Sequence, residues 1–198
     1  ANSMHHNMLG GLLVHTAEVI AQSEQIGDFW EEKYGPNFIN KPLLLSGALL
    51  HDLAKTAELK VDRFSGSTDY SLQASLETHI TMCVSWIDIE AYKLGLGRQE
   101  YSTDDVNETE PLKTTEQLEF EKEAVSLLKH LVLSHHGKKE YGSPISMNCP
   151  EAYILNAADL LSSEMFRFNK DFSTLEPGES LSKWLSGTMF TTYKDSTK

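Results

Sequence analysis

Cysteine is scarce in this sequence. Among 198 residues there are only two, Cys83 and Cys149, and they do not form a CxxC pair. Two isolated cysteines in a chain without an export signal are typical of a reducing compartment, so we expect free thiols and a cytoplasmic location. A reactive cysteine is the alternative, but we interpret both as small, partly buried side chains that fill space in the core.

Long apolar runs and an excess of basic residues are also missing. The chain lacks the roughly 18 consecutive apolar residues of a membrane span, and no basic segment precedes an apolar one, so we expect neither a membrane partner nor a signal peptide. The net charge of −12 argues against a broad nucleic-acid-binding surface. It still allows a nucleotide or an RNA 3′ end at a metal site, where the cation supplies positive charge.

The overall composition is that of an ordinary globular protein. Its 40% hydrophobic residues suffice for the core of one domain over residues 1–198. Apolar residues at helical spacing predict helices over 8–26, 43–57, 72–94, 115–136 and 150–168. The predicted fold class is therefore all-α, a helical bundle with at most a small β-hairpin near residues 59–70.

The boundaries and connections of these helices are predicted from local signals. Gly27 stands at a plausible C-cap of the first helix, and residues 28–40 are interpreted as a connection. The helix over 43–57 is apolar on most sides, which is typical of a central, buried helix. The acidic stretch 98–116 is interpreted as a surface loop, and the tail 171–198 contains an apolar cluster, residues 181–190, expected to form a short docking helix.

Histidines and aspartates occur in unusual places. The sequence has eight histidines. Polar residues at the end of, or inside, apolar runs are His15, His51, Asp52, His79, His135, His136 and Asp159. Any one of them can be satisfied structurally, but a buried carboxylate must be paired or must bind metal. Because the apolar faces of a helical bundle converge, these polar groups are expected to converge as well.

This set of side chains predicts a particular kind of site. Imidazole and carboxylate ligands together suit Zn, Mn, Fe, Ni or Co better than Ca or Mg alone. His51 and Asp52 are neighbours about 100° apart on a helix, so both can face one pocket only from the helix edge. Asp52 has two oxygens and can bridge two metals, and Lys55 on the same side can hold a phosphate oxygen. For Lys55, a solvated lysine near a helix end is the alternative.

The order of these residues resembles a known family. His15, then His51 and Asp52, then Asp159 is similar to the H…HD…D pattern of the HD superfamily of metal-dependent phosphohydrolases. Residues 49–55, LLHDLAK, look like its HD-x-x-K helix, and the added histidines resemble members that hold two metals. Three stretches, HHNMLGGLLVHT at 5–16, LSHHGK at 133–138 and YGSP at 141–144, resemble the HD domain of YhaM-type 3′→5′ exoribonucleases. HD domains attached to conjugative relaxases begin similarly.

The resemblance, which covers about residues 5–170, implies roles for individual residues. One metal would be held by His15, His51, Asp52 and Asp159, and the second by His79, His135 and His136, with Asp52 bridging. The catalytic residues would be Asp52 and Lys55. Lys138 and Arg167 are candidate substrate contacts, each with a simple surface charge as the alternative. His130 is interpreted as structural or surface, and His5 and His6 receive no role.

Two departures from the subfamily pattern bear on the substrate. Thr78 stands where relatives usually have a glycine, and 98–116 looks like an insertion. The OB-fold domain that such exonucleases carry upstream is not in this sequence, so an upstream OB-fold domain in a longer parent protein remains an open possibility.

The expected function is hydrolysis of a phosphoester. Two divalent cations about 3.5–4 Å apart would activate a water for attack on phosphorus. Nucleotides or single-stranded nucleic-acid 3′ ends are the expected substrates, which makes the chain a phosphodiesterase or nuclease, with manganese among the candidate metals. A phosphohydrolase of nucleoside mono- or triphosphates is one alternative. A metal- and nucleotide-binding regulatory domain without turnover is another.

Overall fold

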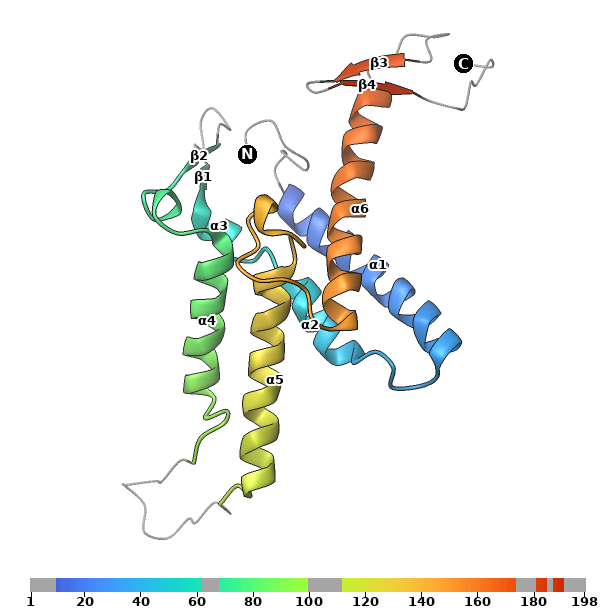
Figure 1. Ribbon diagram of the computed structural model, residues 1–198. Helices are drawn as coiled ribbons and strands as arrows, with labels where there is room; N and C mark the ends of the chain where they lie inside the picture. The colour runs from blue at the N-terminus through green and yellow to red at the C-terminus, as the bar shows by residue number, and fades with distance from the viewer. Residues whose placement is uncertain (1–9, 62–67, 100–111, 174–180, 185–186, 191–198) are drawn as a thin grey trace.

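The computed structural model describes residues 10–61, 68–99, 112–173, 181–184 and 187–190 (Figure 1). The predicted positions His5 and His6 and most of the acidic segment 98–116 lie outside these residues. The described helices are α1 (Gly11–Tyr34), α2 (Lys41–Leu50), α3 (Lys55–Glu58), α4 (His79–Lys93), α5 (Thr115–Ser134) and α6 (Pro150–Phe172). Short 3₁₀ turns are η1 (Gln73–Ser75) and η2 (Lys139–Tyr141).

The strands are few and short. Strands β1 (Leu59–Val61) and β2 (Thr68–Tyr70) form an antiparallel pair in which Leu59 lies opposite Tyr70. Strands β3 (Leu181–Trp184) and β4 (Gly187–Phe190) form a second antiparallel pair at the far end of α6 (Figure 1). The all-α class and the hairpin near 59–70 are confirmed. The helix expected over 181–190 is wrong, because this segment pairs as strands.

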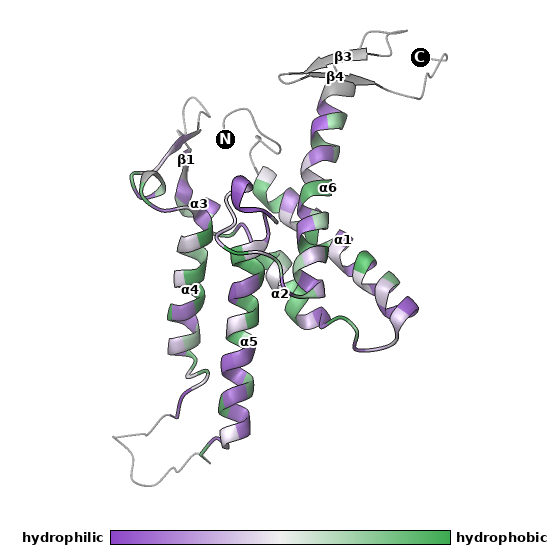
Figure 2. Ribbon diagram, viewed as in Figure 1, coloured by the Kyte–Doolittle hydropathy of each residue, from purple (hydrophilic) through white to green (hydrophobic). Residues whose placement is uncertain are grey.

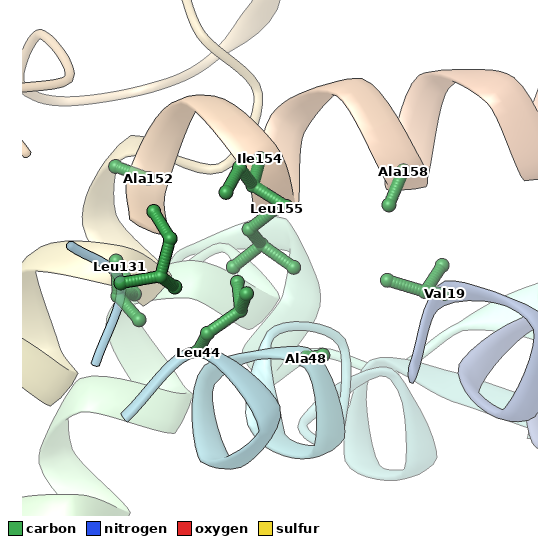
Figure 3. Packing of buried hydrophobic residues seen from close by; sticks show 9 residues of the cluster. Val19, Leu44, Ala48, Leu131, Ala152, Ile154, Leu155 and Ala158 are labelled. Atoms are coloured by element: carbon green, nitrogen blue, oxygen red, sulfur yellow. The ribbon is translucent and has the colours of Figure 1, made fainter. Parts of the chain in front are cut away.

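Two clusters of buried side chains hold the helices together. The first core cluster joins α1, α2, α5 and α6 through Val19, Ile39, Leu44, Ala48, Leu131, Ala152, Ile154, Leu155 and Ala158. Figure 3 shows Val19 of α1 facing Ala158 of α6, and Leu44 of α2 facing Leu155. The second core cluster joins α4, α5 and the turn after α2 through Ala54, Ile80, Met82, Cys83, Ile87 and Val132. Hydrophobic and hydrophilic residues accordingly alternate along α5 and α6 (Figure 2).

The first helix is longer than expected. Gly27 is not a C-cap: it is buried inside α1, which continues to Tyr34, and Gly35 with φ 103° follows it. A Cβ on Gly27 would lie 3.4 Å from Leu44, so this glycine permits close packing of α1 on α2. The predicted connection 28–40 is therefore helical in its first half. Gly35 ends the helix because it adopts positive φ without strain.

The second helix differs from the expectation in two ways. It ends at Leu50, and residues 51–54 form a tight turn before the short helix α3. In this turn Leu53 N–H donates to the Leu50 carbonyl and Lys55 N–H to the Asp52 carbonyl, three residues back instead of four. Leu49 is 54% exposed, so the helix is not buried on all sides. The turn directs the side chains of both His51 and Asp52 into the interior.

The helix expected over 72–94 begins only at His79. Leu72 and Leu76 are exposed and flank the 3₁₀ turn η1. Thr78 is the N-cap of α4: its side chain accepts from Thr81 N–H, and the Thr81 side chain accepts from Thr78 N–H. The threonine that replaces the expected glycine thus fixes the start of the helix that carries His79.

Among the described residues, no helix combines the length and apolar character needed to cross a membrane.

The close approach of α2 and α5 generates a stability prediction. A Cβ added to Gly47 would lie 2.5 Å from Leu131 Cδ1 and 3.1 Å from its Cβ. Although alanine is about 1 kcal/mol better than glycine inside a helix, we expect Gly47→Ala to lower the free energy of unfolding by about 1–3 kcal/mol through overpacking. Urea denaturation measures this, with Ser46→Ala on the exposed side of the same helix as the control. An unchanged or higher midpoint for Gly47→Ala would contradict the prediction.

Candidate metal centre

The structure brings all the predicted metal-site residues together from five parts of the chain. His15 lies on α1, His51 and Asp52 in the turn after α2, His79 at the first position of α4, His135 and His136 just after α5, and Asp159 on α6. They form two groups of potential ligand atoms, each within 4.8 Å: His15, His51 and Asp159 (the first group), and Asp52, His79, His135 and His136 (the second group).

The first group is compact and almost closed to solvent. His15 Nε2 lies 3.1 Å from Asp159 Oδ1 and 3.3 Å from His51 Nε2. Both histidines are buried, and Asp159 is 15% exposed. The ligand atoms of three elements, α1, α6 and the turn after α2, therefore meet at one point.

Asp52 connects the first group to the second. Its Oδ2 lies 3.5 Å from His51 Nε2 and 3.6 Å from His15 Nε2. Its Oδ1 lies 3.3 Å from His79 Nε2 and 3.7 Å from His135 Nε2. Each oxygen of one buried carboxylate thus faces a different set of imidazoles.

The hydrogen bonds made by the Nδ1 atoms show which ring nitrogen is free. The Nδ1 atoms of His51, His135 and His136 lie 2.7–2.8 Å from the backbone carbonyls of Ala48, Val132 and Tyr141. A carbonyl only accepts, so each Nδ1 carries the hydrogen, and in a neutral ring Nε2 then presents a lone pair. This arrangement, in which an outer partner fixes the tautomer, is typical of histidines that bind metal.

The interior atoms of the cluster have no hydrogen-bond partner of their own. Asp52 Oδ1, His79 Nε2 and His135 Nε2 are buried and unpaired among the described residues. Acceptors that face one another at 3.3–3.7 Å repel unless positive charge lies between them. Nitrogen and oxygen donors of this kind fit divalent transition-metal cations. The residues present are therefore able to hold metal.

Burial and charge set the ionisation of the cluster. Burial lowers the pKa of His51 to about 4 and that of His79 to about 3, so both rings are neutral near pH 7. Burial would raise the pKa of Asp52, but the charges of His51 and Lys55 hold it well below its usual range. The pKa of Asp159 is about 2: burial opposes its charge, and the neighbouring imidazoles of His15 and His51 outweigh this. Neutral imidazoles beside ionised carboxylates are ready to bind a cation without losing protons.

Lys55 lies next to the shared carboxylate. Its Nζ is 2.6 Å from Asp52 Oδ2, and its side chain is largely buried. Burial opposes the ammonium charge, but Asp52 outweighs this effect and raises the pKa of Lys55. The lysine is therefore not a freely solvated surface side chain.

The two predicted substrate contacts lie outside the cluster of ligands. Lys138 is exposed in the turn after His136, with Nζ 5.8 Å from the centre of the Tyr141 ring. Arg167 pairs with Glu164 at 2.6 Å and lies eight residues beyond Asp159, about 12 Å along α6. Their contact with substrate stays a prediction.

His130 and the two cysteines were interpreted as residues without a role in the metal centre. His130 Nε2 accepts from Asn148 N–H at 3.1 Å and so holds the loop before α6, as a structural histidine does. Cys83 and Cys149 are free thiols, and Cys83 is buried, with a pKa raised to about 11 by that burial.

Several residues that contact the clustered histidines were not found from the sequence. Glu58 accepts from His79 N–H at 3.4 Å, and its other oxygen lies 3.4 Å from His79 Nδ1. Ser162 Oγ lies 2.9 Å from His15 Nδ1 and donates to Glu18 at 2.7 Å. Glu58 follows Lys55, Ser162 follows Asp159 and Glu18 follows His15, each by three residues. This spacing of about one helical turn was the sequence signal that could have identified them.

The lowered histidine pKa values predict how stability depends on pH. In the metal-free protein, the pKa values of His51 and His79 lie below the value of 6.5 of an unfolded chain, so the unfolded state binds protons first as pH falls. Their contribution to stability is complete above pH 6.5 and is lost as pH falls toward 4, by on the order of 1 kcal/mol per pH unit for each. Asp52 and Asp159 add losses only below about pH 4.

Urea denaturation of chelator-treated protein between pH 7.5 and about pH 4.5 tests this expectation. His51→Asn removes one titrating ring and should give a shallower slope than the wild type. An unfolding free energy that stays constant over this range would contradict the prediction.

Comparison with known proteins agrees with the geometry of the site. The family model described as "HD domain" matches residues 12–164. The chain is similar to the 3′-5′ exoribonuclease YhaM of Oceanobacillus iheyensis (33% identical over 181 residues, 90% of this chain and 46% of that protein) and of Bacillus subtilis (32% identical over 181 residues, with the same coverage). The protein of that name from Listeria innocua is 32% identical over 177 residues, 88% of this chain and 45% of that protein.

The chain thus spans about half the length of the curated relatives it matches. No solved structure gives a significant match. Because the HD model covers most of the chain and its relatives match nearly all of it, this chain belongs to the HD-domain family.

Proposed function

We propose that this chain is the hydrolytic domain of a divalent-metal-dependent phosphodiesterase that acts on RNA 3′ ends. One observation carries the proposal: the two oxygens of the buried Asp52 face separate sets of imidazole nitrogens, and its Oδ1 has no hydrogen-bond partner among the described residues. The relatives named 3′-5′ exoribonuclease support the choice of substrate.

Two cations fit the donor set. The first would be held by His15, His51, Asp52 and Asp159, and the second by His79, His135 and His136, with Asp52 shared. When bound, such cations supply an acidified water as nucleophile and Lewis-acid stabilisation of the phosphate oxygens. Manganese, iron, cobalt, nickel and zinc suit these ligands.

The residues of the chain contribute orientation and charge. The Nδ1 hydrogen bonds hold the imidazoles in place, so little reorganisation is needed when the site binds its ligands. The Lys55 ammonium, 2.6 Å from Asp52, lies where it can stabilise charge that develops on a phosphate oxygen. Lys138, in the turn that follows His136, and Arg167, further along α6, are proposed to contact the substrate outside this centre.

The acidic character of the chain limits how it can bind RNA. With a net charge of −12, it has no general attraction for a polyanion, so binding depends on the metal site and the few cations near it. The relatives are about twice as long as this chain. We therefore propose that most of the RNA-binding surface belongs to a second domain, such as an OB-fold domain.

The same acidic charge favours one alternative, a phosphohydrolase of mononucleotides or nucleoside triphosphates. A small nucleotide fits a metal site without any need for an extended basic groove. The two candidates share the metal centre and differ in substrate only.

A panel of substrates and metals separates the candidates. The chelator-treated protein would receive Mn²⁺, Co²⁺, Ni²⁺ or Mg²⁺ and then 5′-labelled single-stranded RNA, single-stranded DNA, cyclic dinucleotides or mononucleotides. We expect Mn²⁺ to support shortening of RNA from its 3′ end, and a blocked 3′ end to prevent it. Turnover of mononucleotides alone would indicate the alternative. A metal-loaded protein inert on every substrate would indicate a regulatory domain.

Loss of the shared carboxylate tests the metal centre directly. We expect Asp52→Ala to lose bound metal and to lower hydrolysis by on the order of 10³-fold, which corresponds to several kcal/mol of transition-state stabilisation. Metal analysis and initial rates measure both effects. The matched control is Asp88→Ala, since Asp88 is an exposed acid on α4 that pairs with Lys129. Full activity with unchanged metal content in Asp52→Ala would refute the mechanism.

Lys55 is expected to act on turnover more than on metal content. Lys55→Met keeps most of the length of the side chain but removes its charge, so kcat should fall by about 10²-fold. Lys60→Met, which removes an exposed lysine of β1, is the control. If kcat is unchanged in Lys55→Met, or falls only in proportion to lost metal, the role in charge stabilisation is wrong.

A further inference from the structure

A chain of hydrogen bonds leads from the first group of ligands to a half-buried carboxylate. His15 Nδ1 lies 2.9 Å from Ser162 Oγ, and Ser162 Oγ lies 2.7 Å from Glu18 Oε2. His15 and Ser162 are buried. Glu18 follows His15 by one turn of α1, and Ser162 follows Asp159 by one turn of α6. The chain thus joins two packed helices directly behind the ligands.

His15 differs from the other histidines of the centre in the partner of its Nδ1. His51, His135 and His136 face carbonyls, and His79 lies beside the carboxylate of Glu58, all of which only accept. A serine hydroxyl, in contrast, can either donate or accept. Ser162 alone therefore does not decide which nitrogen of His15 carries the hydrogen.

The contact of Ser162 with Glu18 bears on which nitrogen of His15 carries the hydrogen. A hydroxyl has one hydrogen, and Ser162 gives it to the Glu18 carboxylate. The serine oxygen then has only lone pairs to offer His15, so a hydrogen bond between the two requires the ring hydrogen on Nδ1. A competing acceptor exists on the other side, because Asp159 Oδ1 is 3.1 Å from Nε2 and would attract the hydrogen there.

We propose that Glu18, acting through Ser162, is a positioning residue that fixes the hydrogen of His15 on Nδ1. Nε2 is thereby kept as a lone pair directed at the first group, instead of carrying a hydrogen directed at Asp159. The consequence for metal binding rests on the proposed function. Partners of this kind typically change metal affinity by about 10–100-fold.

Three variants separate hydrogen placement from packing. Glu18→Ala frees the Ser162 hydrogen to turn toward His15 Nδ1, which would move the ring hydrogen to Nε2. Ser162→Ala removes the partner of Nδ1 and should act in the same direction. Glu18→Gln keeps an oxygen that accepts from Ser162 and should resemble the wild type more closely. The matched control is Ser23→Ala, because Ser23 is a fully buried serine of α1 whose hydroxyl has no partner within the described part of the chain.

Two measurements test the proposal. In metal-free protein labelled with ¹⁵N-histidine, long-range ¹H–¹⁵N spectra at about pH 8 report which ring nitrogen is protonated. We expect the hydrogen of His15 on Nδ1 in the wild type and Ser23→Ala, and on Nε2 in Glu18→Ala and Ser162→Ala. In Mn²⁺ titrations, the latter two variants should lose about 10–100-fold in affinity for one of the two cations. Thermal melting would verify that each variant is folded.

The possible results distinguish this inference from the proposed function. If the wild type binds two cations but His15 has the same hydrogen placement and affinity in every variant, the inference is overturned and the proposed function stands. If the wild type binds no divalent cation, the proposed function is overturned, and the spectra of the metal-free variants alone decide whether Glu18 places the hydrogen. If the His15 hydrogen moves to Nε2 in Glu18→Ala and Ser162→Ala, and these variants also bind one of the two cations more weakly, the inference and the proposed function are both supported.

Discussion

The arrangement of this protein depends on one buried carboxylate, Asp52. A carboxylate in an apolar interior is strongly destabilising unless positive charge or hydrogen-bond donors compensate it. Lys55 supplies one charge at 2.6 Å, but the other neighbours of Asp52 are imidazole nitrogens that present lone pairs. The residues around Asp52 thus leave part of its charge uncompensated, and a divalent cation on each side of the carboxylate would complete the balance. The site is poorly suited to stabilise the fold by itself and well suited to bind metal.

The two core clusters explain how ligands from distant parts of the chain reach one carboxylate. Asp159 directly follows Ala158, and His51 follows Ala48 by one turn, so both extend from the first core cluster. His79 precedes Ile80, and His135 follows Val132, so the second group extends from the second core cluster. Asp52 lies in the turn that leads from one cluster to the other. Packing of apolar side chains, which is not directional, thereby positions ligands that need definite directions.

The sequence predicted which histidines and aspartates gather in the interior better than it predicted the elements that carry them. Histidine or aspartate within an apolar run is costly, so positions such as Asp159 stand out without knowledge of the fold. Gly27 gave the wrong helix end, because a glycine can serve either as a cap or as a site of close packing, and only the neighbouring Leu44 decides. The helix predicted over 181–190 was wrong for a related reason, because so short an apolar run does not distinguish a strand from a helix. Glu18, Glu58 and Ser162 are ordinary residues for a helix surface, and their roles appear only when the facing helices are placed.

His51 and Asp52 are both buried where α2 ends and a turn with hydrogen bonds three residues back begins. In a continuous α-helix, the side chains of His51 and Asp52 would diverge by about 100°. Both are nevertheless buried, because side chains of α1, α4 and the end of α5 surround Asp52 through His15, His79 and His135, while Leu49 and Leu53 are exposed. Exposure of two leucines reduces the apolar area buried and so costs stability. Burial of a carboxylate beside two exposed leucines indicates that this part of the chain favours the polar cluster over the packing of apolar side chains.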